Sequence, residues 1–235
     1  MEELNTLQKI AIIAPPFALA IILHEVSHGW IAEKLGDPTA RNAGRLTLNP
    51  LPHIDLFGSI IMPIMLYVAT AGQFVLGSAK PVPINPYNFK KPKRDMALSS
   101  LAGPGVNLLM AVSFAVLLRF VLPIVGRAVP ASLWETIALP VALMLGSGVF
   151  INVALAVLNL IPIPPLDGSR IVYWLLPDKL AALYYRLEPF GMFIILALFV
   201  FHVLDAIIWP ILISILYFLL GKEILLFLIG YLFKG

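Results

Sequence analysis

The chain has 235 residues, of which 60% are hydrophobic and only 12% are charged. A soluble domain carries about 25% charged residues, so this composition excludes an ordinary water-soluble globular protein. The absence of cysteine excludes disulfide bonds, and the net charge of +3 is more typical of lysines and arginines in membrane-protein loops than of nucleic-acid binding.

Long, nearly charge-free runs indicate membrane-spanning helices, because a helix needs about 20 apolar residues to cross the hydrocarbon core of a bilayer. We therefore predict an all-α polytopic membrane protein with about five or six transmembrane helices, forming a single membrane-embedded domain over residues 1–235. Its core is expected at about residues 10–175 and its C-terminal helices at 188–233. The apolar runs are residues 10–31, 57–75, 96–118, 137–163, 190–204 and 207–220.

The first apolar run contains the sequence HEVSH at residues 24–28. Residues four apart lie on one face of a helix, so His24 and His28 can direct two imidazoles at one point. This is the spacing of a zinc site in which the intervening glutamate, Glu25, acts on water. Each ionisable group in the hydrocarbon region costs on the order of 3 kcal/mol, which favours a metal site over a chance occurrence. A solvated motif at the membrane interface is the alternative.

The segment after the first run predicts a small β-hairpin and re-entrant element near residues 40–76. Residues 36–56 place Gly, Pro and Asn around the alternating sequence GRLTL, a pattern typical of a short strand or hairpin. The loops that follow the first two runs are both basic and should both be cytoplasmic. A single crossing by residues 57–75 would put them on opposite sides, so we expect this run to re-enter. An ordinary span with one basic loop outside is the alternative.

A catalytic zinc ion takes three protein ligands, so a third ligand must come from elsewhere. Asp167 is the strongest candidate, because the sequence NLIPIPPLDG ends the 137–163 helix and presents one carboxylate. His53 and Asp55, in the loop after the first run, are more simply explained as exposed loop residues, and His202 and Asp205 as an interfacial turn. If Asp167 joins His24 and His28, the first and fourth runs must be parallel, with one crossing between them. One crossing between them requires that residues 57–75 do not span the membrane, which the loop charges also predict.

The sequence resembles the site-2 protease family of intramembrane metalloproteases, in its compact prokaryotic branch. The resemblance rests on HEVSHGW at 24–30, LAGPGVN at 101–107 and NLIPIPPLDG at 159–168, with GRLTLNP and AKPVPINPYN between them. It covers most of residues 20–175. The interval from His28 to Asp167 is longer than in the minimal three-helix core of the family, and no segment resembles a PDZ or CBS module.

This resemblance implies that His24, His28 and Asp167 hold Zn²⁺ and that Glu25 is the general base. It also implies that Asn159 donates a hydrogen bond to the substrate carbonyl or oxyanion, although a helix–helix hydrogen bond is an equal alternative. For two further amides in apolar runs, Asn107 and Asn152, a structural role is favoured.

We therefore expect an intramembrane zinc metalloendopeptidase that cleaves within or near transmembrane segments of membrane proteins. It is expected in a prokaryotic cell membrane, in contact with the lipid bilayer, with its active site toward the cytoplasm and no nucleic-acid partner. A transporter or channel that uses intramembrane His, Glu and Asp is the main alternative, and a proteolytically silent scaffold is another. The substrate, the oligomeric state and the role of His53 stay open.

Overall fold

The computed structural model describes residues 4–61, 64–65, 68, 79–128 and 130–232. Four long helices dominate it: α1 (Thr6–Lys34), α4 (Pro92–Val116), α7 (Leu139–Asn159) and α11 (Val203–Leu232). The shorter elements are α2 (Thr39–Asn42), η1 (Leu51–His53), η2 (Leu56–Ile61), η3 (Pro86–Asn88), η4 (Leu117–Val121), α5 (Leu122–Ala128), α6 (Ala131–Leu133), η5 (Trp134–Ala138), α8 (Asp167–Leu175), α9 (Asp178–Tyr185), η6 (Glu188–Phe190) and α10 (Gly191–Val200).

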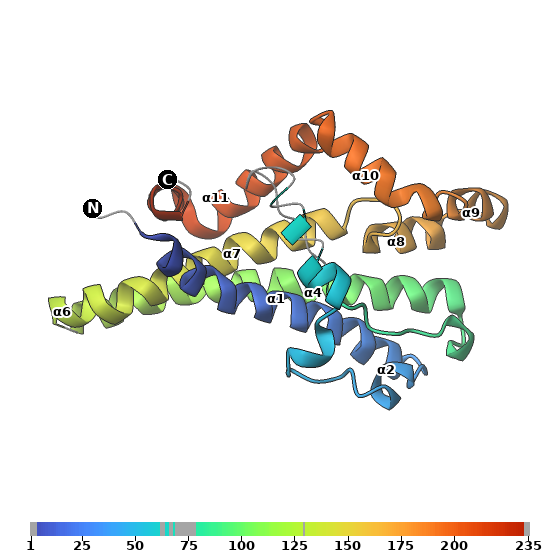
Figure 1. The fold of residues 1–235 in the computed structure, drawn as a ribbon, viewed down its shortest axis with the longest axis horizontal. Helices are drawn as coiled ribbons and strands as arrows, with labels where there is room; N and C mark the ends of the chain where they lie inside the picture. The colour runs from blue at the N-terminus through green and yellow to red at the C-terminus, as the bar shows by residue number, and fades with distance from the viewer. Residues whose placement is uncertain (1–3, 62–63, 66–67, 69–78, 129, 233–235) are drawn as a thin grey trace.

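Helices α1, α4 and α7 form the centre of the molecule, where each packs against the other two (Figure 1). Small buried side chains, including Ala20, Ala111 and Ala142, allow this close approach, as small residues do between membrane helices. Helix α11 covers α7 from the other side and adds Leu212 and Leu216 to the same apolar core. The three central helices therefore make a rigid base on which polar side chains can be held.

Five stretches of the described residues are long and apolar enough to cross a membrane: 6–34, 92–128, 134–159, 178–200 and 206–232. Large apolar side chains such as Leu109, Ile124, Phe193 and Phe218 are exposed on the outside of these helices, as expected for surfaces that face lipid. These observations confirm the prediction of an all-α membrane architecture. Helix α11 is interrupted at Gly221, whose φ of 76° lies in the left-handed region.

The predicted β-hairpin is wrong, because no strand occurs among the residues that the structure describes. The GRLTL segment instead folds back on itself through turns. The backbone N–H of Arg45 donates to the carbonyl of Ala40 at 2.9 Å, and the carbonyl of Thr47 is bound by the imidazole of His53 at 2.9 Å. These local partners take up backbone groups that a strand ladder would need. Most of the predicted re-entrant run, residues 57–75, lies outside the described residues.

Candidate active site

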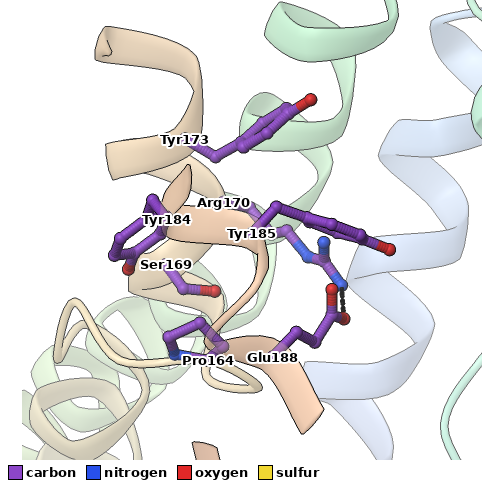
Figure 2. A pocket seen from close by; sticks show the side chains of 7 residues that line it. All are labelled: Pro164, Ser169, Arg170, Tyr173, Tyr184, Tyr185 and Glu188. Carbon is purple, nitrogen blue, oxygen red and sulfur yellow. Dashed lines mark hydrogen bonds and ion pairs between the residues drawn. The ribbon is translucent and has the colours of Figure 1, made fainter. Parts of the chain in front are cut away.

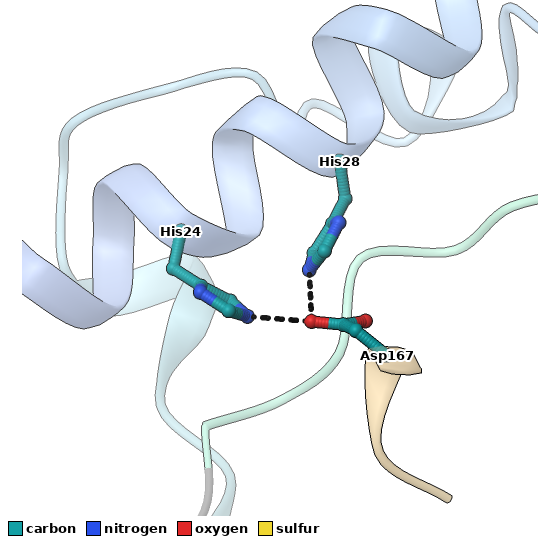
Figure 3. Close-up of side chains that lie close together, drawn as sticks. All are labelled: His24, His28 and Asp167. Carbon is teal, nitrogen blue, oxygen red and sulfur yellow. Dashed lines mark ion pairs between the residues drawn. The ribbon is translucent and has the colours of Figure 1, made fainter. Parts of the chain in front are cut away.

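Three polar side chains meet where the C-terminal half of α1 faces the start of α8. The Nε2 atoms of His24 and His28 lie 3.2 and 3.3 Å from Oδ2 of Asp167, and both rings point toward this carboxylate (Figure 3). Both histidines are buried. The helical spacing of four residues places the two imidazoles on one face, as the sequence predicted, and the structure brings Asp167 to them.

Asp167 reaches this position because the chain turns back after α7. Helix α7 ends at Asn159, and the prolines at 162, 164 and 165 cannot continue it. Helix α8 then begins at Asp167 itself, which places the carboxylate at the first helical position. Because α1 and α7 both direct their C-terminal ends toward this site, the two helices run parallel, and α4 runs antiparallel against both (Figure 1).

Hydrogen bonds on the far side of each imidazole place a proton on Nδ1. Nδ1 of His28 contacts the backbone carbonyl of Ser99 at 2.8 Å, and Nδ1 of His24 contacts Oδ1 of Asn107 at 2.5 Å. Both partners are acceptors, so each Nδ1 carries a proton, and in the neutral imidazole each Nε2 then presents a lone pair. The amide of Asn107 is oriented in turn, since its Nδ2 donates to Oδ1 of Asn152 at 2.7 Å and to the carbonyl of Ala20 at 3.3 Å.

In the neutral form of both imidazoles, two lone pairs and a carboxylate converge on one point, which is an environment suited to a cation. Oδ2 of Asp167 is buried and has no hydrogen-bond partner among the described residues. Ligand atoms of a tetrahedral zinc ion with bonds of about 2.0 Å lie about 3.3 Å apart, close to the separations of Asp167 from each histidine. His24, His28 and Asp167 are also a group whose ligand atoms all lie within 4.8 Å of one another. Their chemistry and spacing fit zinc.

Glu25 is not a member of this ligand group. One of its carboxylate oxygens, Oε2, accepts a hydrogen bond from the backbone N–H of Val82 at 2.8 Å. Val82 is buried and belongs to the proline-rich segment at residues 79–85, which crosses α1 on its way to α4. Glu25 is therefore held through one oxygen, while its other oxygen makes no hydrogen bond within the part of the chain that the structure describes.

The family model of peptidase family M50 matches residues 12–202, which is most of the chain. The chain belongs to peptidase family M50. This confirms the resemblance to site-2 proteases that the sequence motifs indicated.

Curated relatives of this M50 member carry provisional assignments as zinc metalloproteases. YwhC of Bacillus subtilis (strain 168) is 34% identical over 194 residues, covering 83% of this chain and 82% of YwhC. Rip2 of Mycolicibacterium smegmatis is 31% identical over 154 residues, and Rip2 of Mycobacterium tuberculosis is 32% identical over 150 residues; each alignment covers 64% of this chain and 51% of Rip2. The chain thus spans about half the length of Rip2. No solved structure matches it.

Together, the family, the relatives' names and the described ligand group confirm zinc as the cofactor expected from the sequence. The other sequence candidates lie elsewhere in the M50 chain. Nδ2 of Asn159 donates to the carbonyl of Leu155 in its own helix at 3.0 Å. His53 is buried and contacts Thr47, and Oδ2 of Asp55 accepts from the N–H of Gly58 at 2.6 Å. His202, with a φ of 57°, lies between α10 and α11. The ligand group includes none of them.

Helix α4 contributes the residues that sequence reasoning undervalued. Asn107 is fully buried and contacts His24 of the candidate metal group, in addition to joining the helices as expected. At Gly103, a Cβ atom would lie 2.5 Å from Nε2 of His28 and 2.6 Å from Cε1 of His24. The spacing of Gly103 and Asn107, four residues apart in LAGPGVN, places both on the helix face toward α1. That spacing was the sequence signal that could have indicated their position next to the histidines.

A second carboxylate anchors the proline-rich segment beyond the end of α1. Asp37 accepts hydrogen bonds from the backbone N–H of Asn85 at 2.7 Å and the side-chain amide of Asn88 at 2.7 Å. Thr39 also donates to it through its N–H and its hydroxyl. Burial alone would raise the pKa of Asp37, but these hydrogen bonds outweigh it and hold the pKa below its ordinary value. Asp37 thus fixes the segment that carries Val82.

Proposed function

We propose that this chain is an intramembrane zinc metalloendopeptidase that hydrolyses peptide bonds within or near transmembrane segments of membrane proteins. The observation that carries the proposal is the convergence of His24, His28 and Asp167, with Glu25 on the same helical turn, in a chain with five candidate spans. Membership of a peptidase family supports the reaction type.

The proposed mechanism assigns His24, His28 and Asp167 to the metal. Zinc bound there would act as a Lewis acid that polarises the scissile carbonyl and activates water. Glu25 follows His24 directly, so its carboxylate can accept a proton from the attacking water and deliver it to the leaving amine. The N–H of Val82 holds one oxygen of Glu25, which restricts the carboxylate to one orientation and leaves the second oxygen for this proton transfer.

Asn159 is assigned to the substrate. Its Nδ2 donates one of two N–H groups to Leu155, so the second N–H remains for a substrate carbonyl or oxyanion. Its position at the end of α7, where the chain turns toward Asp167, supports this role. Because the site must admit water and an unwound peptide, the substrates are proposed to be transmembrane segments of small or already trimmed membrane proteins.

The proposed orientation places the active site toward the cytoplasm of a prokaryotic cell. The flanks of the 57–75 run support it, because the N–H of Lys80 donates to the carbonyl of His53 at 2.9 Å. A single crossing between these residues would separate them by about 30 Å of hydrocarbon. Lys93, in the next basic segment, donates to the carbonyl of Leu176 after α8 at 2.8 Å. The basic loops thus gather at one end of the molecule, which the positive-inside rule assigns to the cytoplasm.

Single-cysteine labelling tests this orientation cleanly, because the natural chain has no cysteine. Arg41→Cys and Lys90→Cys place exposed thiols in the first and second basic loops. In oriented membrane vesicles, both should react with an impermeant maleimide from the cytoplasmic face. Labelling of the two positions from opposite faces would contradict the proposed topology.

Reconstitution with a model transmembrane substrate tests the activity. Wild-type protein should cleave the substrate, and Glu25→Gln should lose about 10²- to 10⁴-fold in turnover while keeping one zinc per chain. Asp167→Ala should lose both zinc and cleavage. Glu33→Gln, further along α1 and paired with Arg41, is the matched control and should retain activity. Cleavage by Glu25→Gln at the wild-type rate, or ion flux with an intact substrate, would contradict the proposal.

A further inference from the structure

The turn that delivers Asp167 is contacted from its far side by residues 184–191, at the junction of α9, η6 and α10. We infer that these residues form a clamp that positions Asp167, so that Tyr184, Glu188 and Gly191 are positioning residues of the metal site. The inference rests on the proposed function, since it assigns these residues to the same zinc group.

The first contact holds the turn before Asp167. The hydroxyl of Tyr184, near the end of α9, donates to the carbonyl of Pro162 at 2.9 Å. Prolines at 162, 164 and 165 have no backbone N–H, so the turn can form few hydrogen bonds of its own. Within it, the N–H of Ile163 donates to Ile161 and that of Leu166 donates to Ile163. A turn with so few internal bonds depends on outside contacts for its position.

The second contact holds the helix that begins at Asp167. Arg170 lies three residues after Asp167 in α8 and pairs with Glu188 of η6, with Nη2 and Oε1 2.6 Å apart (Figure 2). Both side chains are half-buried, so solvent screens the pair less than it screens an exposed one. Figure 2 shows Pro164 and Ser169 beside this pair, lining one small cavity together with the tyrosines at 173, 184 and 185.

Glu188 also lines that cavity. Its volume is about 10 Å³, which is room for one water molecule. Oε2 of Glu188 is buried without a hydrogen-bond partner among the described residues. Glu188 therefore contributes one oxygen to Arg170 and lines the cavity beside the turn.

The third contact is steric. Gly191 begins α10 directly against Pro164, and a Cβ atom there would overlap the Pro164 carbonyl oxygen. Only glycine allows the two backbones to approach this closely. The clamp therefore contacts the chain on both sides of Asp167: at Pro162 and Pro164 before it, and at Arg170 after it.

The clamp makes zinc affinity depend on the position of α9 and α10. Groups that orient a metal ligand typically change metal affinity by about 10- to 100-fold when they are lost. A purely structural contact would instead lower the stability of the metal-free protein and leave the ligand geometry of the folded fraction unchanged. Zinc affinity and metal-free stability thus separate the two roles.

The experiment uses the full chain in detergent and measures zinc affinity by competition with a chromophoric chelator, together with the Tm of the zinc-free protein. Tyr184→Phe and Glu188→Gln should each weaken zinc binding by about 10- to 100-fold with little change in zinc-free Tm. The exchanged pair Arg170→Glu with Glu188→Arg should recover most of the affinity that Arg170→Glu alone loses. Gly191→Ala should also weaken binding, because it displaces Pro164.

Asp178→Asn is the matched control, because Asp178 lies in α9 and pairs with Lys93 at 3.0 Å but does not contact the turn. It should keep wild-type affinity. Wild-type zinc affinity in Tyr184→Phe and Glu188→Gln, or losses matched by an equal effect of Asp178→Asn, would overturn the clamp while leaving the proposed function intact. A wild-type chain that binds no zinc would instead overturn the proposed function and the clamp with it.

Discussion

Oδ1 of Asn107 lies 2.5 Å from Nδ1 of His24, so an uncharged amide in α4 turns Nε2 of this imidazole toward Asp167. The same amide donates to Asn152 of α7, and Asn152 donates to Gly148 at 2.8 Å. The three central helices are thereby joined to one imidazole through a chain of buried hydrogen bonds. Removing any one of these hydrogen-bond partners should therefore change the zinc affinity.

Replacing Asn107 by Leu should lower zinc affinity by about 10- to 100-fold, because His24 loses the acceptor that keeps its proton on Nδ1. Zinc titration of the purified variant measures this. Ser113→Ala, which removes a hydroxyl bonded to Leu109 within the same helix, is the control and should bind zinc normally. Equal affinities for the wild type and Asn107→Leu would show that the amide only packs the helices.

Gly103→Ala should abolish zinc binding or reduce it by more than about 100-fold, because the added methyl group would occupy the space of both imidazoles. Gly105→Ala provides a close comparison, since a Cβ atom there meets nothing within 4 Å and the change keeps α4 intact. Zinc content and proteolysis should fall in the first variant and persist in the second. Normal zinc content in Gly103→Ala would contradict the described approach of α4 to the histidines.

Val82→Pro should reduce kcat by about tenfold or more with unchanged zinc content, because it removes the N–H that orients Glu25. The substitution suits this position, since Val82 already lies between Pro81 and Pro83 and the following proline disfavours helical backbone there. Val82→Ala retains the N–H and should stay near wild-type kcat. If both variants lose activity equally, the side chain of Val82 and not its N–H is what matters.

Asp37→Asn should destabilise the protein by about 1–3 kcal/mol at neutral pH, because the new amide group faces donors. The pKa of Asp37 is lowered in the folded protein, so its carboxylate stabilises the fold above its unfolded pKa of about 3.8. This contribution is lost as the pH falls through the lower, folded pKa. The Tm difference between wild type and variant should therefore be largest near pH 7 and shrink below about pH 4. A difference that stays constant down to pH 3 would rule out this ionic role.

The meeting of the three candidate metal ligands could be predicted from the sequence because each residue has a strong local signal. A histidine pair four residues apart needs only helical periodicity, and Asp167 follows a proline stop at the end of an apolar run. The prediction of a strand at GRLTL was wrong because five alternating residues are a weak signal. In the structure, His53 and Ala40 bind the backbone groups that a strand partner would use.

The supporting contacts had weaker signals. Val82 holds Glu25 through its backbone N–H. Nearly every residue type has this group, so the sequence does not indicate such a contact. Asn107 was visible as a polar residue in an apolar run, but its partner across the helix interface was not. The contacts of residues 184–191 with the turn at 162–165 depend on how the chain folds back after α8.

The hydrogen bond between the N–H of Lys80 and the carbonyl of His53 closes the chain path around the intervening residues. A segment whose two ends are held together can change in length without moving the helices on either side. The entropic cost of closing a longer loop grows only logarithmically with its length. The interval between the histidine pair and α4 is therefore a natural place for insertion, deletion or exchange of sequence. A short turn grafted between His53 and Lys80 would make a smaller protein on the same three-helix base.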